Sequence, residues 1–316
     1  MTTLPMDAIL LLRLAYIICA LLVLVIASVP PLRARFLDYG PRTARQNDGK
    51  SVEESEKGPN FVLVMLDKAG SICVPHSWFT SFYAVSVLSS LFWASEVMLK
   101  GPFFGAVARN LSHGNTMRFE QVVVTWLLMF AQGSRRLWEC LTLSTPSKSK
   151  MWFGHWVLGV LFYIGTGLAV WIEGVATLQS HKFTINDLTL TGPNPRTIVG
   201  ILIFILSSGM QHDCHAYLAS LKKTPKGENK SEYRLPDHPA FHISLTPHYF
   251  AECLIYTSLS ILAAPQGEWL NWTFVAALFF VVVNLGVTAD GTRKWYREKF
   301  GQEAIAGRAR MVPSIY

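Results

Sequence analysis

Long apolar segments recur along almost the whole chain and constrain its fold more than any other feature. A helix that crosses the hydrocarbon core of a bilayer needs roughly 20 mostly apolar residues. Seven segments meet or approach that length, over residues 8–29, 78–99, 121–143, 152–178, 197–218, 249–264 and 269–289. Because residues 249–264 form the shortest segment, the pattern predicts six to seven transmembrane helices in an all-α, polytopic membrane helix bundle.

The composition agrees with a membrane protein and argues against other classes. The chain of 316 residues is 51% hydrophobic and 16% charged, whereas soluble domains carry about 25% charged residues. Its net charge is +7, but no basic stripe interleaved with aromatic residues lies outside the apolar segments, so no nucleic-acid partner is expected. Five scattered cysteines form neither a disulfide framework nor a metal-binding pattern.

The chain shows no sign of a separate soluble domain. The first apolar segment leads into a long polar stretch without a small-residue cleavage site, so we expect a retained anchor and not a signal peptide. We therefore predict an N-terminal anchor and cytosolic loop over residues 1–73, followed by one membrane domain over residues 74–316.

Lysine and arginine are distributed unequally between the connections of the apolar segments. The first, third and fifth connections and the C-terminal tail carry 20 of them, whereas the alternate connections carry 5. Cytosolic loops are enriched in Lys and Arg. The split predicts a cytosolic C-terminus, a lumenal N-terminus and an odd number of spans.

Polar side chains interrupt four of the apolar segments. They are Arg135, Arg136 and Glu139; His212, Asp213, Cys214 and His215; His248 and Glu252; and Asn284 with Asp290. Ionisable groups at membrane depth are costly, so each faces another helix or a cavity. Arg135 with Glu139 and His248 with Glu252 are i,i+4 pairs on one helix face. Each cluster alone is compatible with an ion pair between helices, but four together favour a shared polar cavity.

Two further patterns have simpler interpretations. His212 and His215 lie near one helix face and imidazole suits zinc, but no second ligand pair follows at a recognisable spacing, so no metal is predicted. Gly165-Thr166-Gly167 lacks the third glycine and the preceding strand of a dinucleotide-binding fingerprint. These small residues are expected to permit close packing of helices.

Several motifs resemble the steroid 5α-reductase family, and within it the polyprenol reductase branch. They are VPHSWFTSFYAVSVL at 74–88, SRRLWECLTLS at 134–144, SSGMQHDCHAYLASLKK at 207–223, YRLPDHPAFHISLTPHYFAECLIYTSL at 233–259, and WYREKF followed by GRARMVPSIY at the C-terminal end. The resemblance covers most of the chain from residue 74 onward, and the RRLWEC element resembles the polyprenol branch in particular.

The resemblance implies that the C-terminal helices enclose NADPH in a cavity open to the cytosol. Carried over residue by residue, the cofactor-binding positions are Gln211, His215, Lys222, Arg234, His248, Glu252, Asn284, Tyr296 and Arg308. Lys and Arg near the cytosolic mouth suit the phosphates of the cofactor. The family also implies a multi-pass protein of the endoplasmic reticulum membrane.

The chain departs from the family pattern at three places. A usual glycine is His238, a usual asparagine is His248, and a usual Ser-His-Phe-Tyr element reads Thr80-Ser81-Phe82-Tyr83. The last change removes one candidate proton donor, and the first two put the local cofactor contacts in doubt.

Chemical reactivity favours an unsaturated aldehyde as the substrate. Hydride adds poorly to an isolated alkene, but it adds to the β-carbon of a conjugated carbonyl, where a hydrogen-bond donor stabilises the developing enolate. The long-chain polyprenoid substrate expected for this branch is therefore polyprenal in preference to polyprenol, on the path to dolichol for protein glycosylation. The candidate catalytic residues are Glu139, Tyr83 and Arg136, with Glu139 preferred because a carboxylate at this depth is costly. Tyr83 could instead be an ordinary packed aromatic.

Three other functions remain open. A steroid-like enone reductase would share the fold, and a membrane methyltransferase acting on a prenyl substrate would bind S-adenosylmethionine in a similar region. The basic residues at the expected phosphate sites argue against the methyltransferase. A transporter would show paired broken helices in two related halves, and the sequence shows no such symmetry.

Overall fold

In the part of the chain that the structure describes, seven helices of 16 residues or more form a bundle, and each matches one predicted apolar segment. The computed structural model describes residues 7–37, 61–111, 114–144, 149–184, 187, 194–222 and 233–316. The long helices are α1 (Ala8–Ser28), α4 (Thr80–Met98), α6 (Phe119–Thr142), α7 (Phe153–Ile172), α9 (Pro195–Leu221), α11 (Pro247–Leu262) and α12 (Trp272–Phe300). The predicted all-α bundle is confirmed, while most of the expected cytosolic loop, over residues 38–60, lies outside the described residues.

Five of the long helices are long and apolar enough to cross a membrane, namely α1, α4, α7, α9 and α12. The 24-residue α6 contains two arginines and two glutamates, and α11 has only 16 residues. The protein is therefore a polytopic membrane protein, whereas the count of six to seven crossings remains a prediction. The proposed boundary between residues 73 and 74 also remains a prediction.

Three predicted segments differ in length from the helices that form. The segment 152–178 is divided, because α7 ends at Ile172 and Gly174 precedes the short α8 (Val175–Ser180). Conversely, α9 and α12 continue beyond their apolar parts to Leu221 and Phe300. Their last turns contain Leu, Lys, Arg and Glu, which have high helix propensity and do not depend on lipid contact.

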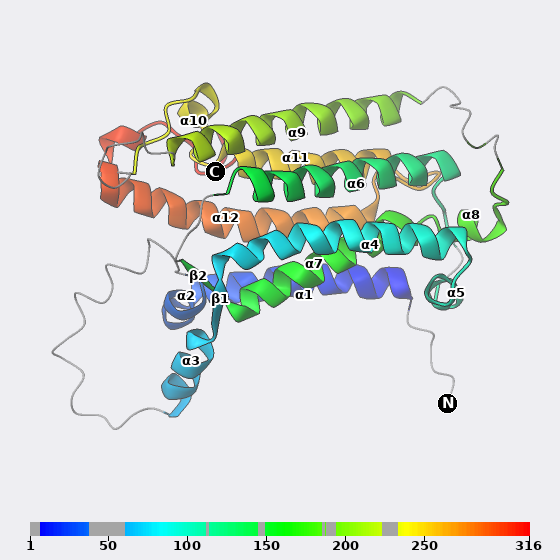
Figure 1. Ribbon diagram of the computed structural model, residues 1–316, viewed down its shortest axis with the longest axis horizontal. Coiled ribbons are helices and arrows are strands. Elements are labelled where there is room, and N and C mark those ends of the chain that lie inside the picture. The colour runs from blue at the N-terminus through cyan, green and yellow to red at the C-terminus, as the bar shows by residue number, and fades with distance from the viewer. Residues whose placement is uncertain are drawn as a thin grey trace.

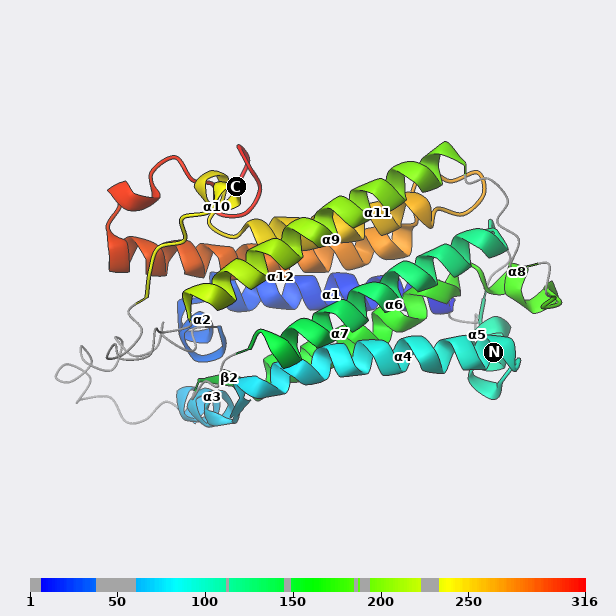
Figure 2. The same cartoon turned by 45° about the horizontal axis from the view of Figure 1, so that its top comes forward.

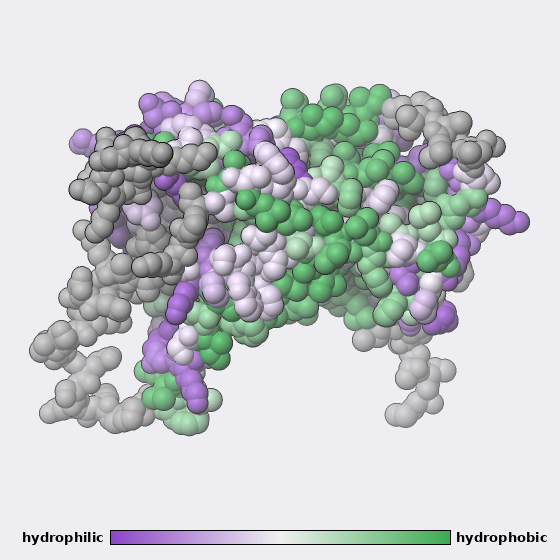
Figure 3. Space-filling model, viewed as in Figure 1, coloured by the Kyte–Doolittle hydropathy of each residue, from purple (hydrophilic) through white to green (hydrophobic). Residues whose placement is uncertain are grey.

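Consecutive long helices run in opposite directions, so their connections gather at two ends of the bundle (Figure 1). One end, called the α10 end below, carries α2 (Pro30–Phe36), α3 (Phe61–Ser71), α10 (Pro239–Ile243), η4 (Glu303–Ile305) and the C-terminus. The other end carries α5 (Pro102–Arg109), α8 and the start of α1, as the turned view also shows (Figure 2). Apolar side chains cover the middle of the bundle and polar ones gather toward its ends (Figure 3).

A small strand pair fixes the start of α4 next to the start of α7. Strands β1 (Cys73–Pro75) and β2 (Lys150–Trp152) pair antiparallel, with Val74 opposite Met151. The 3₁₀-helix η2 (His76–Phe79) then leads directly into α4. This arrangement lies at the α10 end (Figure 1).

Small residues allow several helices to approach closely. A Cβ atom at Gly200 of α9 would lie 2.5 Å from the Cβ of Leu262 in α11. In α7, a Cβ at Gly167 would collide with the side chain of Ser89, and one at Gly165 would lie 3.2 Å from the hydroxyl of Tyr16 in α1. The predicted packing role of the glycines at 165 and 167 is therefore confirmed.

The close approach of α9 and α11 can be tested with one added methyl group. Gly200→Ala is expected to lower the free energy of unfolding by about 1–3 kcal/mol, because the methyl group meets Leu262 and the core does not yield freely. Gly209→Ala on the same helix is the matched control, because nothing lies within 4 Å of its Cβ position. It should be neutral or stabilising by up to about 1 kcal/mol. The free energies of unfolding of both variants are compared in the same detergent, and equal changes would contradict the close approach of α9 and α11 at Gly200.

Candidate active site

One face of α6 carries a stripe of buried polar side chains. Gln132, Arg136 and Glu139 are 5%, 9% and 3% exposed, and Arg135 lies beside them. Their spacing of three to four residues places them on consecutive turns of the same face. The stripe lies near the C-terminal end of α6, in the half of the bundle toward the α10 end.

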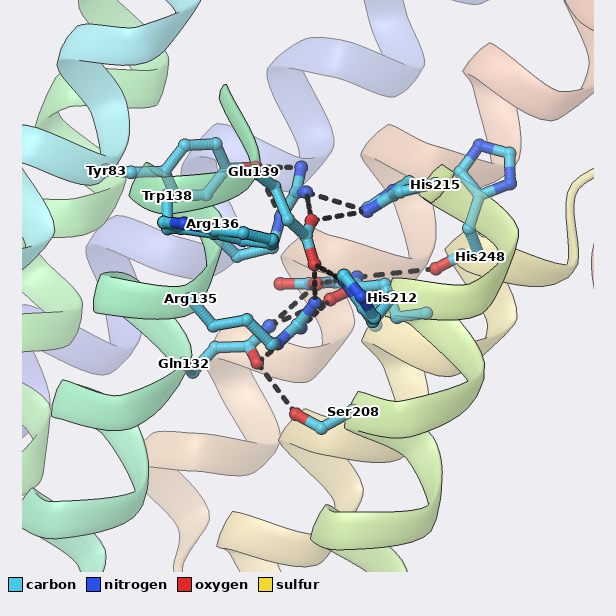
Figure 4. Close-up of polar contacts among 12 residues, drawn as sticks. Tyr83, Gln132, Arg135, Arg136, Trp138, Glu139, Ser208, His212, His215 and His248 are labelled. Atoms are coloured by element: carbon cyan, nitrogen blue, oxygen red, sulfur yellow. Dashed lines mark hydrogen bonds and ion pairs between the residues drawn. The ribbon is translucent and has the colours of Figure 1, made fainter. Parts of the chain in front are cut away.

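Glu139 is the centre of the polar contacts (Figure 4). Its carboxylate forms ion pairs with both Arg135 and Arg136. The Nδ1 atoms of His212 and His215, one helical turn apart on α9, each lie 2.8 Å from a different carboxylate oxygen. Every one of these partners can donate a hydrogen bond, so Glu139 acts as an acceptor that holds α6 and α9 together.

Arg136 connects Glu139 to the phenol of Tyr83. Its Nη2 atom donates to the Tyr83 hydroxyl oxygen at 2.7 Å and its Nε at 3.2 Å. Tyr83 is 6% exposed, and its ring packs edge-on against Phe79 and Tyr163. Because the phenol oxygen accepts from Arg136, its own hydrogen is available for another acceptor.

A second set of contacts extends the cluster to α11. The amide nitrogen of Gln211 donates to the carboxylate of Glu252, and Gln132 donates to the oxygen of Gln211 at 3.0 Å. The oxygen of Gln132 in turn accepts from Arg135 and, at 2.9 Å, from Ser208. Three helices therefore share one polar network, which joins the clusters on α6, α9 and α11, whereas the shared polar cavity remains a prediction.

His248, at the start of α11, lies against this network. Its ring centre is 5.4 Å from that of His215, and its backbone oxygen is 3.5 Å from the amide nitrogen of Gln211. The Nδ1 atom of His248 is buried and has no hydrogen-bond partner in the described part of the chain. A buried polar atom without a partner is costly, so it marks a position where a ligand could complete the contacts.

The fourth predicted polar cluster, on α12, is an ion-pair site instead. Asp290 lies 3.0 Å from Arg33 of α2 and 3.5 Å from Arg310 of the tail. Asn284 makes no hydrogen bond to the α6–α9–α11 network among the described contacts. Asp290 lies farther toward the α10 end, where Arg33 and Arg310 reach it. At this position the described contacts are therefore ion pairs between segments and do not contribute to the α6–α9–α11 network.

The remaining predicted cofactor residues lie outside the network. Lys222 caps the C-terminal end of α9, and Arg234 is exposed ahead of α10. Tyr296 is buried beside Leu245 and Ile305. Arg308 donates to the backbone oxygens of Pro236 and Phe241, at 3.2 and 3.3 Å. All four belong to the α10 end, and no described hydrogen bond joins them to Glu139 or its partners.

The sequence analysis missed Gln132 and Ser208. Each precedes a recognised polar residue by four positions, Gln132 before Arg136 and Ser208 before His212. Because i,i+4 positions share a helix face, this spacing was a usable signal. No group of three or more His, Cys, Asp or Glu in the described ranges is arranged to hold a metal ion.

A cavity of about 310 Å³ lies at the opposite end of the bundle. Its lining includes Arg13, Glu173 and Trp272, but none of the predicted site residues. Within it, Arg13 forms a 2.9 Å ion pair with Glu173, which also accepts from Thr273. This ion pair links α1, the end of α7 and α12, so we assign the polar groups there to the packing of the bundle. The enclosed cofactor cavity remains a prediction.

Comparison with known proteins decides the family. Residues 149–316 match the family described as 3-oxo-5-alpha-steroid 4-dehydrogenase, which is more than half of the chain. The chain belongs to this family. Its predicted family is thereby confirmed, and the α9–α12 region that supplies His212, His215, Gln211 and Glu252 lies wholly within the matched range.

Full-length similarity extends to proteins named polyprenal reductase. The Rattus norvegicus protein is 26% identical over 321 residues, covering 94% of this chain and 92% of that protein. The Homo sapiens protein is 27% identical over 242 residues, covering 72% and 73%. The Xenopus laevis protein is 29% identical over 197 residues, covering 62% of this chain and 59% of that protein. These relatives support the branch that the RRLWEC element indicated.

Proposed function

We propose that this protein is an NADPH-dependent oxidoreductase that reduces the α-isoprene double bond of polyprenal, on the path to dolichol. The observation that carries the proposal is the similarity to polyprenal reductases over as much as 94% of the chain. The buried Tyr83–Arg136–Glu139 network supports it, because it provides hydrogen-bond donors at membrane depth, where a lipid aldehyde could reach them.

The side chains of the α10 end fit a phosphorylated dinucleotide. Lys222, Arg234 and Arg308 supply positive charge for phosphate groups. The buried Nδ1 atom of His248 has no described hydrogen-bond partner, and the amide group of the nicotinamide could provide one. Gln211 and Glu252 offer further polar atoms beside it. When bound, NADPH supplies a hydride for the β-carbon of the unsaturated aldehyde.

Tyr83 and Arg136 would stabilise the charge that develops on the aldehyde oxygen. The free hydrogen of the Tyr83 hydroxyl can be donated to that oxygen, while Arg136 donates to the phenol oxygen. The proton that completes the reduction adds to the enolate, and the product is the saturated aldehyde. Such a donor is worth about 10²–10³-fold in rate.

The geometry favours Tyr83 over Glu139 as the proton donor. Two partners of Glu139 are arginines, which can only donate, and the two histidines can also donate to it, so its carboxylate has an orienting role for Arg136 and the two histidines. The sequence alone had favoured Glu139, because a carboxylate at this depth is costly. The ion pairs with Arg135 and Arg136 offset the cost of burying the Glu139 carboxylate, so its presence does not require a role in proton transfer.

The proposed membrane placement follows the charge pattern. The α10 end and the C-terminus would face the cytosol, in the endoplasmic reticulum membrane, with NADPH entering from that side. The polyprenoid tail would remain in the bilayer beside the bundle.

Product analysis tests the proposed function. The purified protein in detergent receives NADPH with either polyprenal or polyprenol, and mass spectrometry identifies the products. We expect the saturated aldehyde from polyprenal and no product from polyprenol. Direct reduction of polyprenol would overturn the conjugate mechanism.

A steroid-like enone is the second candidate substrate, because the matched family is described by a steroid reaction. Reduction of a steroid enone with no turnover of polyprenal would favour it. Thermal unfolding with NADPH, NADH and S-adenosylmethionine separates both reductases from a methyltransferase, since only a bound ligand stabilises the folded state.

A further inference from the structure

Helix α3 exposes an apolar surface that the proposed reaction does not explain. None of its eleven residues is buried. Phe61, Val64 and Met65 are 75%, 49% and 53% exposed. Exposed apolar surface costs about 25 cal/mol per Å² in water, and contiguous apolar patches mark contacts with a protein or a membrane.

The polar half of α3 is attached to the protein, so its position is defined. Asp67 forms a 2.6 Å ion pair with Arg35 of α2. The indole nitrogen of Trp152 in β2 donates to the backbone oxygen of Ala69 at 2.9 Å. These contacts hold the C-terminal half of α3 against α2 and the strand pair, while the half beginning at Phe61 points away from the bundle (Figure 1).

The direction of α3 indicates what covers this apolar half. The long helices, five of which are long and apolar enough to cross a bilayer, run along the bundle, whereas α3 lies across that direction at the α10 end (Figure 1). In a bilayer crossed by those five helices, the axis of α3 would run along the membrane surface. At the α10 end, where α3 lies (Figure 1), the apolar band of the viewed face gives way to hydrophilic residues (Figure 3).

We propose that α3 is an interfacial helix whose segment Phe61–Met65 inserts into the boundary between lipid headgroups and acyl chains. Such helices place their apolar side chains about 5–10 Å into this boundary and keep charged residues at the headgroups. Asp67 and Lys68 follow this segment after Leu66. Because α3 continues through β1 and η2 into α4, the inserted segment also anchors the start of the helix that carries Tyr83.

Photocrosslinking in vesicles tests this proposal without relying on activity. Benzoylphenylalanine replaces Phe61 or, in a second variant, Val64, and the protein is reconstituted in phosphatidylcholine vesicles that contain a phosphatidylcholine with an alkyne-bearing acyl chain. Leu21, which is 50% exposed in the middle of α1, is the positive-control position. Glu298, exposed on α12 at the α10 end, is the negative-control position.

We expect lipid labelling at positions 61 and 64 to approach that at position 21 and to exceed that at position 298 several-fold. Labelling no greater than at position 298 would overturn the proposal. So would crosslinks that join two copies of the chain, or that join α3 to another segment of the same chain, because either would identify a protein partner for the apolar surface.

Discussion

Replacing Arg136 with methionine is expected to lower kcat for polyprenal reduction by about 10²–10³-fold. Methionine keeps much of the side-chain length but removes both hydrogen bonds to the Tyr83 oxygen, at 2.7 and 3.2 Å. The phenol then loses the group that stabilises charge during proton transfer. Steady-state kinetics in detergent, at saturating NADPH, gives the change.

Arg135→Met is the matched control for this variant. Arg135 is next in sequence and also pairs with Glu139, but it makes no described contact with Tyr83. Its loss should change kcat much less than the loss of Arg136. Tyr83→Phe should resemble Arg136→Met, and the double variant should be little worse than either single one, because the two residues act as a unit. Equal losses in Arg135→Met and Arg136→Met would contradict the assigned role.

Replacing Glu139 with alanine is expected to destabilise the protein by about 3–5 kcal/mol. Glu139 is 3% exposed and pairs with two arginines. Its removal leaves two positive charges beside one another in a buried region, where the cost of an unpaired charge is high. The loss in the free energy of unfolding is measured by heating the protein or adding denaturant in detergent while the circular dichroism signal of the helices is followed.

Two further variants separate charge from packing at this position. Glu139→Gln keeps the shape and some hydrogen bonds, so its loss should be smaller. Combining Glu139→Ala with Arg135→Met removes one of the unpaired charges and should recover part of the stability. Glu298→Ala, at an exposed position, should have little effect. If Glu139→Ala unfolds like Glu298→Ala, then the arginines have other partners and Glu139 does not hold the network.

The long apolar segments of the sequence predicted the bundle well, because a membrane-spanning helix needs a long run of mostly apolar residues. The sequence also predicted Arg135 and Glu139 as an i,i+4 pair, and that ion pair forms. It placed polar clusters in four apolar segments, three of which share the network, but could not show that Glu139 is the common partner of His212 and His215. Such pairings depend on the rotation and relative height of α6 and α9, which hydropathy does not encode.

Short elements escaped prediction for a related reason. Helix α3 has only six apolar residues before Asp67, too few for a span, so nothing in its length marked it as a membrane element. Gln132 was overlooked because the amide carries no charge and so did not stand out beside the ionisable residues that follow it, although it bridges Arg135 and Gln211. The role of Asp290 required knowledge of Arg33, 257 residues away in the sequence.

The placement of the polar network in one half of the bundle has a practical consequence for reconstituted protein. Glu139 and His215 lie near the C-terminal ends of α6 and α9, and these helix ends lie toward the same end of the bundle as α10 and the C-terminus (Figure 1). A membrane-impermeant dinucleotide added to sealed vesicles could therefore serve only the molecules inserted with that end outward. The oppositely inserted molecules would be latent until a detergent opened the vesicle, so the gain in turnover on permeabilisation would report the sidedness of insertion.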